Sequence, residues 1–356
     1  MPDCRIVRPP PARSRPIGRL LMTTDLPSGA WDATLTLARG LAAAGLRITL
    51  AVPGPSPDPE QRAEALAIAG LQLEERPGRL EWMADSLEDV ALLGEWLLAL
   101  AARDDVELVH THLYGVAALP FAVPVVLQAA PLPLQHRAMP ALVQRGLEHA
   151  ALVVRSGDGP PGSLQIPHGI ELDDAAPADA RDDLIVTAGM LWHPGHGIDL
   201  LDAVAPQIGT RLAAIGSLQG PDRPARQLRH IAPLGSLGRA ARRQRYRTAT
   251  LFALPADDSF AALEAAASGC ALVLANVPSL RVQWDKAACF VPPGNATAWR
   301  DALNRLAADS ARRADLAMAA RIRARRRSAA ALVASWLDAY AQACEGATGT
   351  APVKAA

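Results

Sequence analysis

The chain has 356 residues, of which 50% are hydrophobic, and its 36 basic and 36 acidic residues give a formal net charge of zero. This length exceeds the roughly 250 to 300 residues at which a single core stops growing, so we expect two domains, and the neutral charge gives no electrostatic reason to expect a nucleic acid partner. The four cysteines form no Cys-x-x-Cys pair, which argues against a zinc site and a disulfide framework and favours a reducing cytoplasm. Without a signal-peptide-like stretch or a run of roughly 18 uncharged apolar residues, the sequence predicts a soluble protein.

The first half of the chain alternates predicted strands and helices. After a Pro- and Arg-rich lead over residues 1–17, an apolar strand at 19–24 is followed by a helix at 32–44 and a strand at 47–52. These three elements form a β-α-β unit whose strands pair in parallel. The alternation continues with a helix at 87–102, strands at 108–112 and 123–128, a helix at 141–150 and a strand at 151–155.

A loop rich in Gly and Pro at 156–163 marks the expected domain boundary. The second half then repeats the alternation, with strands at 184–188, 211–215, 250–254, 271–274 and 289–291, followed by helical segments at 298–308 and 310–343. Such alternation is typical of doubly wound α/β domains. We therefore predict two Rossmann-like domains in tandem.

The most informative segment runs from Leu251 to Asn295. A predicted strand ends at Pro255, an acidic loop with Asp258 follows, and an alanine-rich helix then carries Glu264 near its start. A strand, a loop and a helix N-terminus aim backbone N–H groups and a positive helix end at one point, which suits a phosphate or a diphosphate.

This segment resembles the donor-binding core of the GT-B glycosyltransferases of family GT4. The pieces that carry the resemblance occur in the family's order: Ser259-Phe260, Leu263-Glu264-Ala265, Ser268-Gly269-Cys270-Ala271-Leu272-Val273, Pro278-Ser279-Leu280 and Val291-Pro292-Pro293-Gly294-Asn295. The resemblance implies an α/β fold of two Rossmann-like domains facing across a cleft, with a C-terminal helix that crosses back, for which Trp336 and Tyr340 are the candidate contacts. We accordingly expect an acceptor domain at 18–160, a nucleotide-sugar donor domain at 161–328, a crossover helix at 329–344 and a disordered tail at 345–356.

The resemblance also implies a role for individual residues. Glu264 would accept hydrogen bonds from the ribose hydroxyls, and Asp258 would contact the transferred sugar. The phosphates would be bound by the backbone N–H groups of three residues, Ser259, Phe260 and Ala261. From the first domain, Gly29 in the turn after the first strand would allow close approach to the donor diphosphate or the acceptor. Each has an ordinary alternative: an acidic residue at a helix start, an N-cap aspartate, or a simple β-α turn.

The segment after the first strand of the second domain departs from the family pattern. The family has an arginine and a lysine that neutralise the leaving diphosphate, and two cations at that point do much of the catalysis. Here Gly189 is followed by Met190 at the arginine's place, while His196 holds the lysine's place and His193 lies nearby. The histidines could substitute if an adjacent diphosphate keeps them protonated, or they could be loop residues without a ligand. Because Met190 cannot supply charge and the histidines supply it only when protonated, we expect any catalysis to be slower than in the family and to fall as the histidines deprotonate. The loop at Asp258 is also two residues shorter than in the family.

The leading hypothesis is a retaining glycosyltransferase that moves a sugar from a nucleotide-activated donor to a hydroxyl acceptor, with neither a cofactor nor a metal. Its partners would be the donor and a sugar or lipid-linked acceptor. The alternative is a catalytically inactive glycosyltransferase-like binding or partner subunit, which Met190 and the short acidic loop favour. A sugar-nucleotide epimerase is a third alternative, for which no general acid and base pair stands out in the cleft segments.

Four further features are left open by the sequence. His110 and His112 lie two apart at a strand end and could share a face and ligate a metal, although no third ligand lies nearby. The family's histidine after 123–128 is missing, and His136 follows several residues later.

Residues 166–171 indicate a hinge between the domains. Arginines gather at 239–247 and again at 312–327; the second group is interpreted as a solvated helix face, with peripheral attachment to anionic lipid at the inner membrane face as the alternative.

Overall fold

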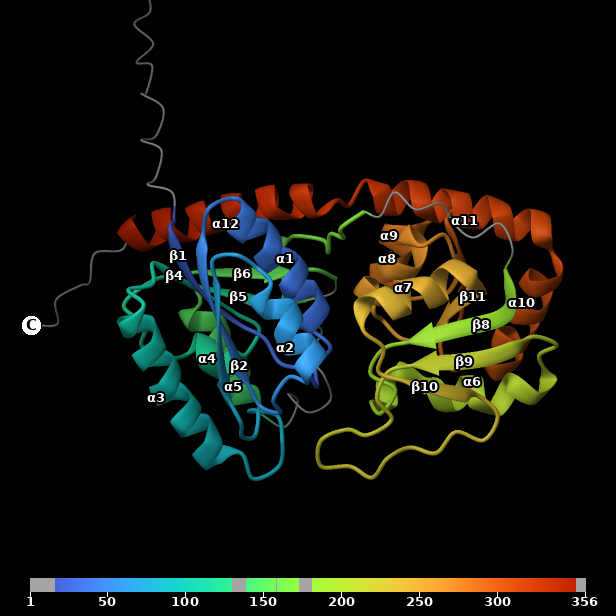
Figure 1. The fold of residues 1–356 in the computed structure, drawn as a ribbon, viewed down its shortest axis with the longest axis horizontal. Coiled ribbons are helices and arrows are strands. Elements are labelled where there is room, and N and C mark those ends of the chain that lie inside the picture. The colour runs from blue at the N-terminus through green and yellow to red at the C-terminus, as the bar shows by residue number, and fades with distance from the viewer. Residues whose placement is uncertain (1–16, 130–138, 158, 173–180, 350–356) are drawn as a thin grey trace, which may run out of the picture.

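The computed structural model describes residues 17–129, 139–157, 159–172 and 181–349. Two α/β domains lie side by side, and the C-terminal helix runs from the second domain back across the first (Figure 1). Each domain is built on one sheet whose described strands pair in parallel. The predicted α/β fold of two Rossmann-like domains with a crossover helix is confirmed.

Within the described residues, the first domain has a seven-stranded sheet in the order β3-β2-β1-β4-β5-β6-β7. Helices α1 and α12 bury residues against one face, and α3, α4 and α5 bury residues against the other. The elements are β1 (Arg19–Thr23), α1 (Trp31–Ala43), β2 (Arg47–Pro53), α2 (Pro59–Leu66), β3 (Leu71–Arg76), α3 (Leu87–Arg103), β4 (Leu108–Thr111), α4 (Tyr114–Ala117), β5 (Val125–Ala129), α5 (Pro140–His149), β6 (Leu152–Arg155) and β7 (Leu164–Gln165).

The described part of the second domain has a six-stranded sheet in the order β10-β9-β8-β11-β12-β13, around one large apolar core. Its elements are β8 (Asp182–Ala188), η2 (Pro194–His196), α6 (Ile198–Val204), η3 (Ala205–Gln207), β9 (Arg211–Ile215), β10 (Ala232–Gly235), α7 (Arg239–Thr248), β11 (Ala249–Leu254), α8 (Ser259–Ala267), β12 (Ala271–Ala275), α9 (Pro278–Trp284), β13 (Ala288–Val291), α10 (Ala296–Ala308) and α11 (Ser310–Arg325). The last helix, α12 (Ala329–Gly349), belongs to the core of the first domain.

Helix α12 contacts the first domain through small and aromatic residues. A Cβ added at Gly40 of α1 would lie 2.3 Å from Cγ2 of Val333, so a larger residue at position 40 would push the two helices apart. Trp336 and Tyr340 are 1% and 0% exposed in the same cluster, as the sequence predicted for the crossover contact.

The two places where the chain passes between the domains lie side by side. Ile170 pairs in parallel with Ser328, its N–H donates to the carbonyl of Arg327 at 2.8 Å, and its carbonyl accepts from the N–H of Ala329 at 2.9 Å. A Cβ at Gly169 would lie 2.7 Å from Cβ of Leu332, so only glycine fits there without a shift. This pairing interrupts the helical region predicted at 310–343 and divides it into α11 and α12.

The expected boundaries need two corrections. Strand β7, which the sequence assigned to the second domain, pairs with β6 in the first sheet, and α12 continues to Gly349 into the expected tail. The sequence also missed α2 and β3. Helix α2 is short and polar, and β3 is an edge strand with charged residues, so neither has an apolar pattern to recognise. Among the described helices, none is both long enough and apolar enough to cross a membrane.

Candidate functional site

The two domains meet at a glycine and a methionine that the sequence had singled out. Gly29 follows β1 and adopts a φ of 75°, a left-handed conformation that favours glycine. A Cβ placed on it would lie 3.7 Å from Cγ of Met190, which follows β8 in the second domain. The carboxyl ends of the two central strands therefore face one another, as open parallel sheets place them at ligand sites.

Three of the other candidate residues gather beside Met190. Gly189 has a φ of 137°, and a Cβ added there would lie 3.1 Å from Nε2 of His196 and 3.4 Å from Oδ2 of Asp258. The end of β8 is thus enclosed by the loop before α6 and the loop before α8. A side chain at position 189 would fill this space.

Asp258 caps helix α8 instead of leaving its N-terminus open. Its Oδ1 accepts the backbone N–H groups of Phe260 at 3.1 Å and Ala261 at 3.0 Å. Two of the N–H groups expected to bind phosphate are therefore bonded to a carboxylate of the same chain, which is the N-cap role that the sequence had left open for Asp258. Burial raises the pKa of Asp258, although the two N–H donors act in the opposite direction.

Burial favours the neutral forms of the two loop histidines. Burial lowers the pKa of His196 to about 4, and its Nε2 lies 3.1 Å from the Ala188 carbonyl, to which it donates. Burial also lowers the pKa of His193, with help from Arg223 and Arg226. Burial therefore opposes the positive charges that the sequence led us to expect on these two side chains, because desolvation disfavours the imidazolium.

Both histidines nonetheless keep one buried nitrogen without a partner among the described residues. These atoms are Nδ1 of His196 and Nε2 of His193. Nδ1 of His193 accepts the N–H of Gly195 at 3.1 Å, which leaves the proton on Nε2 as an unused donor. Buried polar atoms without partners are rare in folded proteins, and at a predicted ligand site they indicate groups that a ligand could satisfy.

Glu264 is buried and bonded to an arginine that the sequence had not paired with it. Its two carboxylate oxygens accept from Nε and NH2 of Arg242 at 2.8 and 2.9 Å. The same arginine reaches Oδ2 of Asp32 in the first domain at 2.9 Å. Only 3% of Glu264 is exposed, so a ribose would have to approach through this pair. The arginine run at 239–247 was visible in the sequence, but no sequence signal identified its partners.

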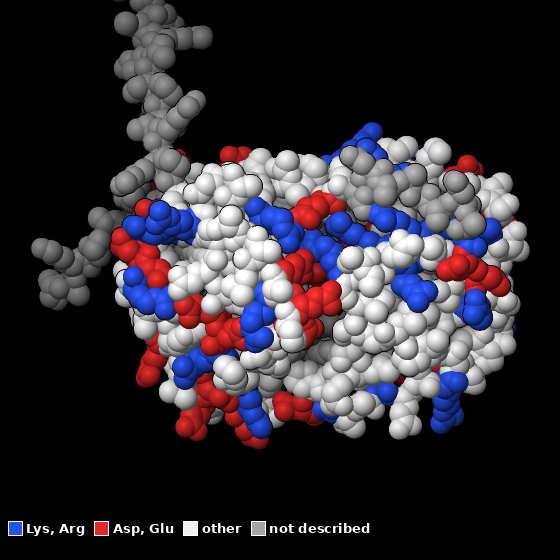
Figure 2. All heavy atoms as spheres, viewed as in Figure 1, with Lys and Arg blue, Asp and Glu red and all other residues white. Residues whose placement is uncertain are grey.

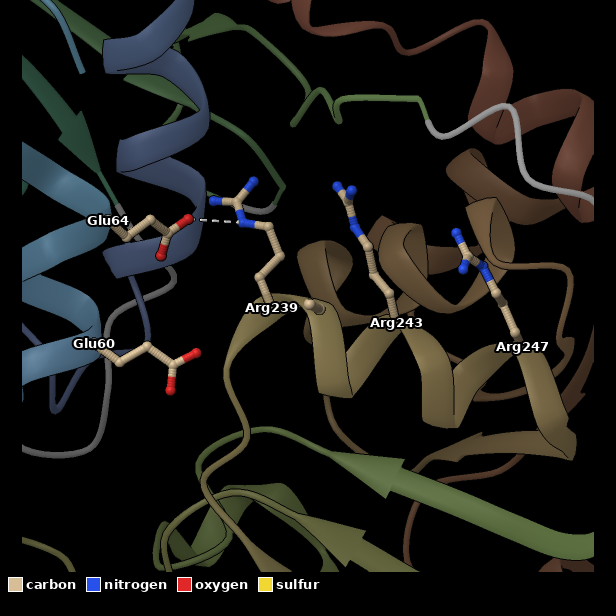
Figure 3. Close-up of a pocket in the computed structure, with 6 residues that line it drawn as sticks. Glu60, Glu64, Arg239, Arg243 and Arg247 are labelled. Carbon is tan, nitrogen blue, oxygen red and sulfur yellow. Dashed lines mark ion pairs between the residues drawn. The ribbon is translucent and has the colours of Figure 1, made fainter. Parts of the chain in front are cut away.

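More ion pairs continue along the domain boundary, where acidic and basic side chains gather (Figure 2). Arg239 of α7 contacts Glu64 of α2 at 3.0 Å and Glu171 at 3.5 Å, and Arg39 of α1 contacts Glu171 at 2.5 Å. Beside them is a pocket of about 370 Å³. It is lined by Glu60, Glu64, Arg239, Ala240, Arg243 and Arg247 (Figure 3).

His110 and His112 have separate partners. Nδ1 of His110 lies 2.8 Å from the Tyr340 hydroxyl, whereas Nε2 of His112 lies 2.5 Å from Oδ2 of Asp25. Strand β4 ends at Thr111, so the strand alternation that would have placed both on one face does not reach His112. The described residues contain no group of three His, Cys, Asp or Glu arranged to hold a metal ion. His136 lies outside the described residues.

The chain is similar to one protein family over part of its length and to many solved structures in its fold. Residues 182–309 match the family model described as glycosyl transferases group 1. The search of curated proteins found no match.

Three solved structures illustrate the likeness of the whole fold. A sucrose-phosphate synthase from Thermosynechococcus elongatus has a TM-score of 0.71 at 17% identity, covering 91% of this chain and 98% of that one. TarM from S. aureus, in complex with fondaparinux, alpha-GlcNAc-glycerol and UDP, has a TM-score of 0.69 at 8% identity, with coverages of 91% and 100%. A UDP-forming alpha,alpha-trehalose-phosphate synthase from Burkholderia vietnamiensis has a TM-score of 0.64 at 13% identity, with coverages of 91% and 99%.

These likenesses agree with the two facing sheets and the crossover helix, and the family match covers the strands and helices that carry Gly189, Asp258 and Glu264. The chain therefore has the GT-B fold, and its second domain matches the group 1 glycosyltransferases.

Proposed function

We propose that this protein transfers a sugar from a nucleotide-activated donor, bound between the two domains, to a hydroxyl acceptor, with retention of the anomeric configuration. The observation that carries the proposal is the convergence of Gly29 and Met190 across the domain boundary, with Gly189 and Asp258 beside them. The family match of the second domain and the UDP-forming trehalose-phosphate synthase among the similar folds support it.

In this proposal the diphosphate lies near the end of β8. His193 donates from its unpartnered Nε2 to a phosphate oxygen, and neutral His196 lines the same site. The N-terminus of α8 contributes its positive end, reduced by the carboxylate of Asp258. Glu264 accepts hydrogen bonds from the ribose hydroxyls after one of the two hydrogen bonds from Arg242 is broken. Met190 stands where the family has an arginine. The developing charge on the leaving group therefore receives less stabilisation, and turnover is slow.

Nucleotide binding without sugar transfer is the second candidate function. Two observations favour it: the carboxylate of Asp258 occupies the anion position at α8, and Arg242 holds both oxygens of Glu264. A protein with this arrangement would serve as a binding or partner subunit.

The test measures, by thermal shift and by calorimetry, whether the protein binds UDP, GDP, ADP, UDP-glucose or GDP-mannose. A ligand that binds only the folded form raises the melting temperature. We expect His193→Ala to weaken nucleoside diphosphate binding about tenfold, the usual effect of losing one hydrogen bond to a charged group. His230→Ala is the matched control, because His230 is an exposed histidine of the same domain.

An assay for release or transfer of the sugar then separates the two candidates. Sugar transfer from a donor that also raises the melting temperature supports the glycosyltransferase function. A product whose anomeric carbon has the inverted configuration would overturn the retaining mechanism. Binding without sugar release supports the second candidate. Failure of all five ligands to bind would contradict both.

A further inference from the structure

One loop of the second domain reaches the first domain beside the proposed donor site. This boundary loop, residues 216–231, joins β9 to β10 and extends toward the first domain (Figure 1). The N–H of Ala84 in the first domain donates to Oδ2 of Asp222 in the loop at 3.1 Å. Asp222 adopts a φ of 56°, a left-handed conformation that aspartate tolerates better than most residues. The boundary loop is therefore held against the first domain at this point.

The boundary loop also packs on Trp192, the residue before His193. A Cβ added at Gly220 would lie 2.5 Å from Cδ2 of Trp192, so a larger residue at position 220 would push the loop away. Nε of Arg226 donates to the Trp192 carbonyl at 3.0 Å. The ring of Trp192 in turn meets the ring of His193 edge to face, with centroids 5.5 Å apart. These contacts fix the loop next to the histidine whose Nε2 lacks a partner among the described residues.

The boundary loop carries one arginine whose guanidinium is available to a ligand. Burial lowers the pKa of His193, and the positive charges of Arg223 and Arg226 lower it further, so both arginines act on this histidine. Arg226 is already paired with Asp199 of α6. Arg223 is exposed, and within the part of the chain that the structure describes its guanidinium forms no hydrogen bond or ion pair. Its backbone is held, because its carbonyl accepts from Nε2 of Gln219 at 2.5 Å.

The proposed donor site needs a cation of this kind. A diphosphate near the end of β8 would meet Met190, which carries no charge, and His193, whose neutral form burial favours. Arginine binds phosphate oxygens through a planar set of N–H donors and keeps its charge across the whole physiological pH range. An arginine beside the Nε2 donor of His193 would add both positive charge and further hydrogen bonds to the same anion.

We propose that Arg223 binds the diphosphate of the nucleotide-activated donor together with Nε2 of His193, and supplies part of the positive charge that Met190 cannot. This inference rests on the proposed function, because it assigns a further residue to the same donor site. Only the side chain of Arg223 has to move, since Asp222 and Gly220 hold the backbone on either side of it. The residue contacts the phosphate oxygens that gain charge as the glycosidic bond breaks, so it would stabilise the leaving group as well as bind it.

The experiment is calorimetric titration of the wild type and its variants with UDP, GDP, ADP and inorganic diphosphate. For each of these that binds, we expect Arg223→Ala to weaken binding about tenfold, because hydrogen bonds to a charged group are lost. Arg223→Lys keeps the charge without the planar set of donors and should lose less than Arg223→Ala. Arg229→Ala is the matched control. It removes an exposed arginine of the same loop whose charge does not act on His193, and it should leave binding unchanged.

The outcomes separate this proposal from the proposed function. A nucleoside diphosphate that binds the wild type and Arg223→Ala equally well would overturn the role of Arg223 and leave the donor site standing. Equal losses in Arg223→Ala and Arg229→Ala would reveal a general effect of net charge and would overturn it too. Binding of inorganic diphosphate that needs Arg223, without binding of any nucleotide, would support the phosphate site and contradict the proposed function.

If none of the four ligands binds, both proposals are wrong. Thermal unfolding of each variant, measured without ligand, separates lost binding from lost folding.

Discussion

Met190 faces Gly29 across the domain boundary and offers a diphosphate only a thioether. The residues around it supply hydrogen bonds but little positive charge, because burial holds His196 and His193 in their neutral forms. The proposed donor site therefore has hydrogen-bond donors but little positive charge. A single substitution at position 190 can supply the missing charge and so test its effect on binding.

Met190→Arg should tighten nucleoside diphosphate binding about tenfold, equivalent to about 1.4 kcal/mol, since a charge-assisted hydrogen bond is worth roughly 1.5 to 3 kcal/mol before the side chain is ordered. If the protein turns over, the rate should rise with it. Calorimetry with UDP and GDP measures the first effect. Met190→Leu, which changes shape but not charge, should behave like the wild type. Equal affinity in the arginine and leucine variants would show that the diphosphate does not lie at this position.

At the scale of elements, α12 depends on a buried histidine of β4. The ring of His110 stacks on Trp336 at 4.2 Å, its Nδ1 bonds to the Tyr340 hydroxyl, and its Nε2 lies 3.1 Å from Oε1 of Gln128. Burial lowers the pKa of His110 to about 3. The docked crossover helix therefore favours the neutral imidazole of His110 over the imidazolium.

The stability of the first domain should fall in acid for this reason. In the unfolded chain His110 has a pKa near 6.5, so between pH 6.5 and 3 the unfolded state binds a proton that the folded state does not bind. The contribution of neutral His110 to the free energy of unfolding is therefore complete above about pH 6.5 and is lost as the pH falls toward 3. Urea unfolding between pH 7 and 4 measures it. In His110→Phe, the slope of stability against pH should be smaller than in the wild type by up to about 1.4 kcal/mol per pH unit.

His149→Gln changes an exposed histidine of α5 and should keep the wild-type slope. His168 and His196, whose pKa values burial lowers to about 4, add to the total slope but are present in both variants. An unchanged slope in His110→Phe would show that His110 is not the group that couples α12 to pH.

At the scale of the whole molecule, polar contacts hold the two domains together beside the α12 crossing. Arg242 joins Asp32 of one domain to Glu264 of the other, and the N–H of Ala84 donates to Oδ2 of Asp222 at 3.1 Å. The rings of Trp82 and Trp192 lie parallel across the same boundary with centroids 6.2 Å apart. These contacts close the boundary between the domains, and under the proposed function a nucleotide-sugar donor would compete with them.

A double-mutant cycle on the buried pair tests this closure. Arg242→Leu should cost about 3 kcal/mol, because it leaves the carboxylate of Glu264 buried without its partner. The double variant Arg242→Leu with Glu264→Leu should be more stable than Arg242→Leu alone, since no charge is then left unpaired. Chemical unfolding of the two single variants and the double variant measures the coupling. Strictly additive effects would mean that the pair contributes no coupling to the folded state.

The sequence by itself determined the alternation of strands and helices and the two sheets, because periodic apolar residues are local signals that the chain displays directly. The burial of Trp336 and Tyr340 followed from the family resemblance of the last helix. It also brought Asp258, Glu264, Gly189 and Met190 to attention as candidates through their order along the chain. Only the tertiary structure decided that Asp258 caps its own helix, that Arg242 holds Glu264, and that Glu60 and Glu64 face the arginines of α7. The cap of Asp258 is local, and the structure chose it between two roles that the sequence had left open. The partners of Glu264, Glu60 and Glu64 lie on other elements or in the other domain, and such pairing depends on how the sheets are oriented, which no local pattern records.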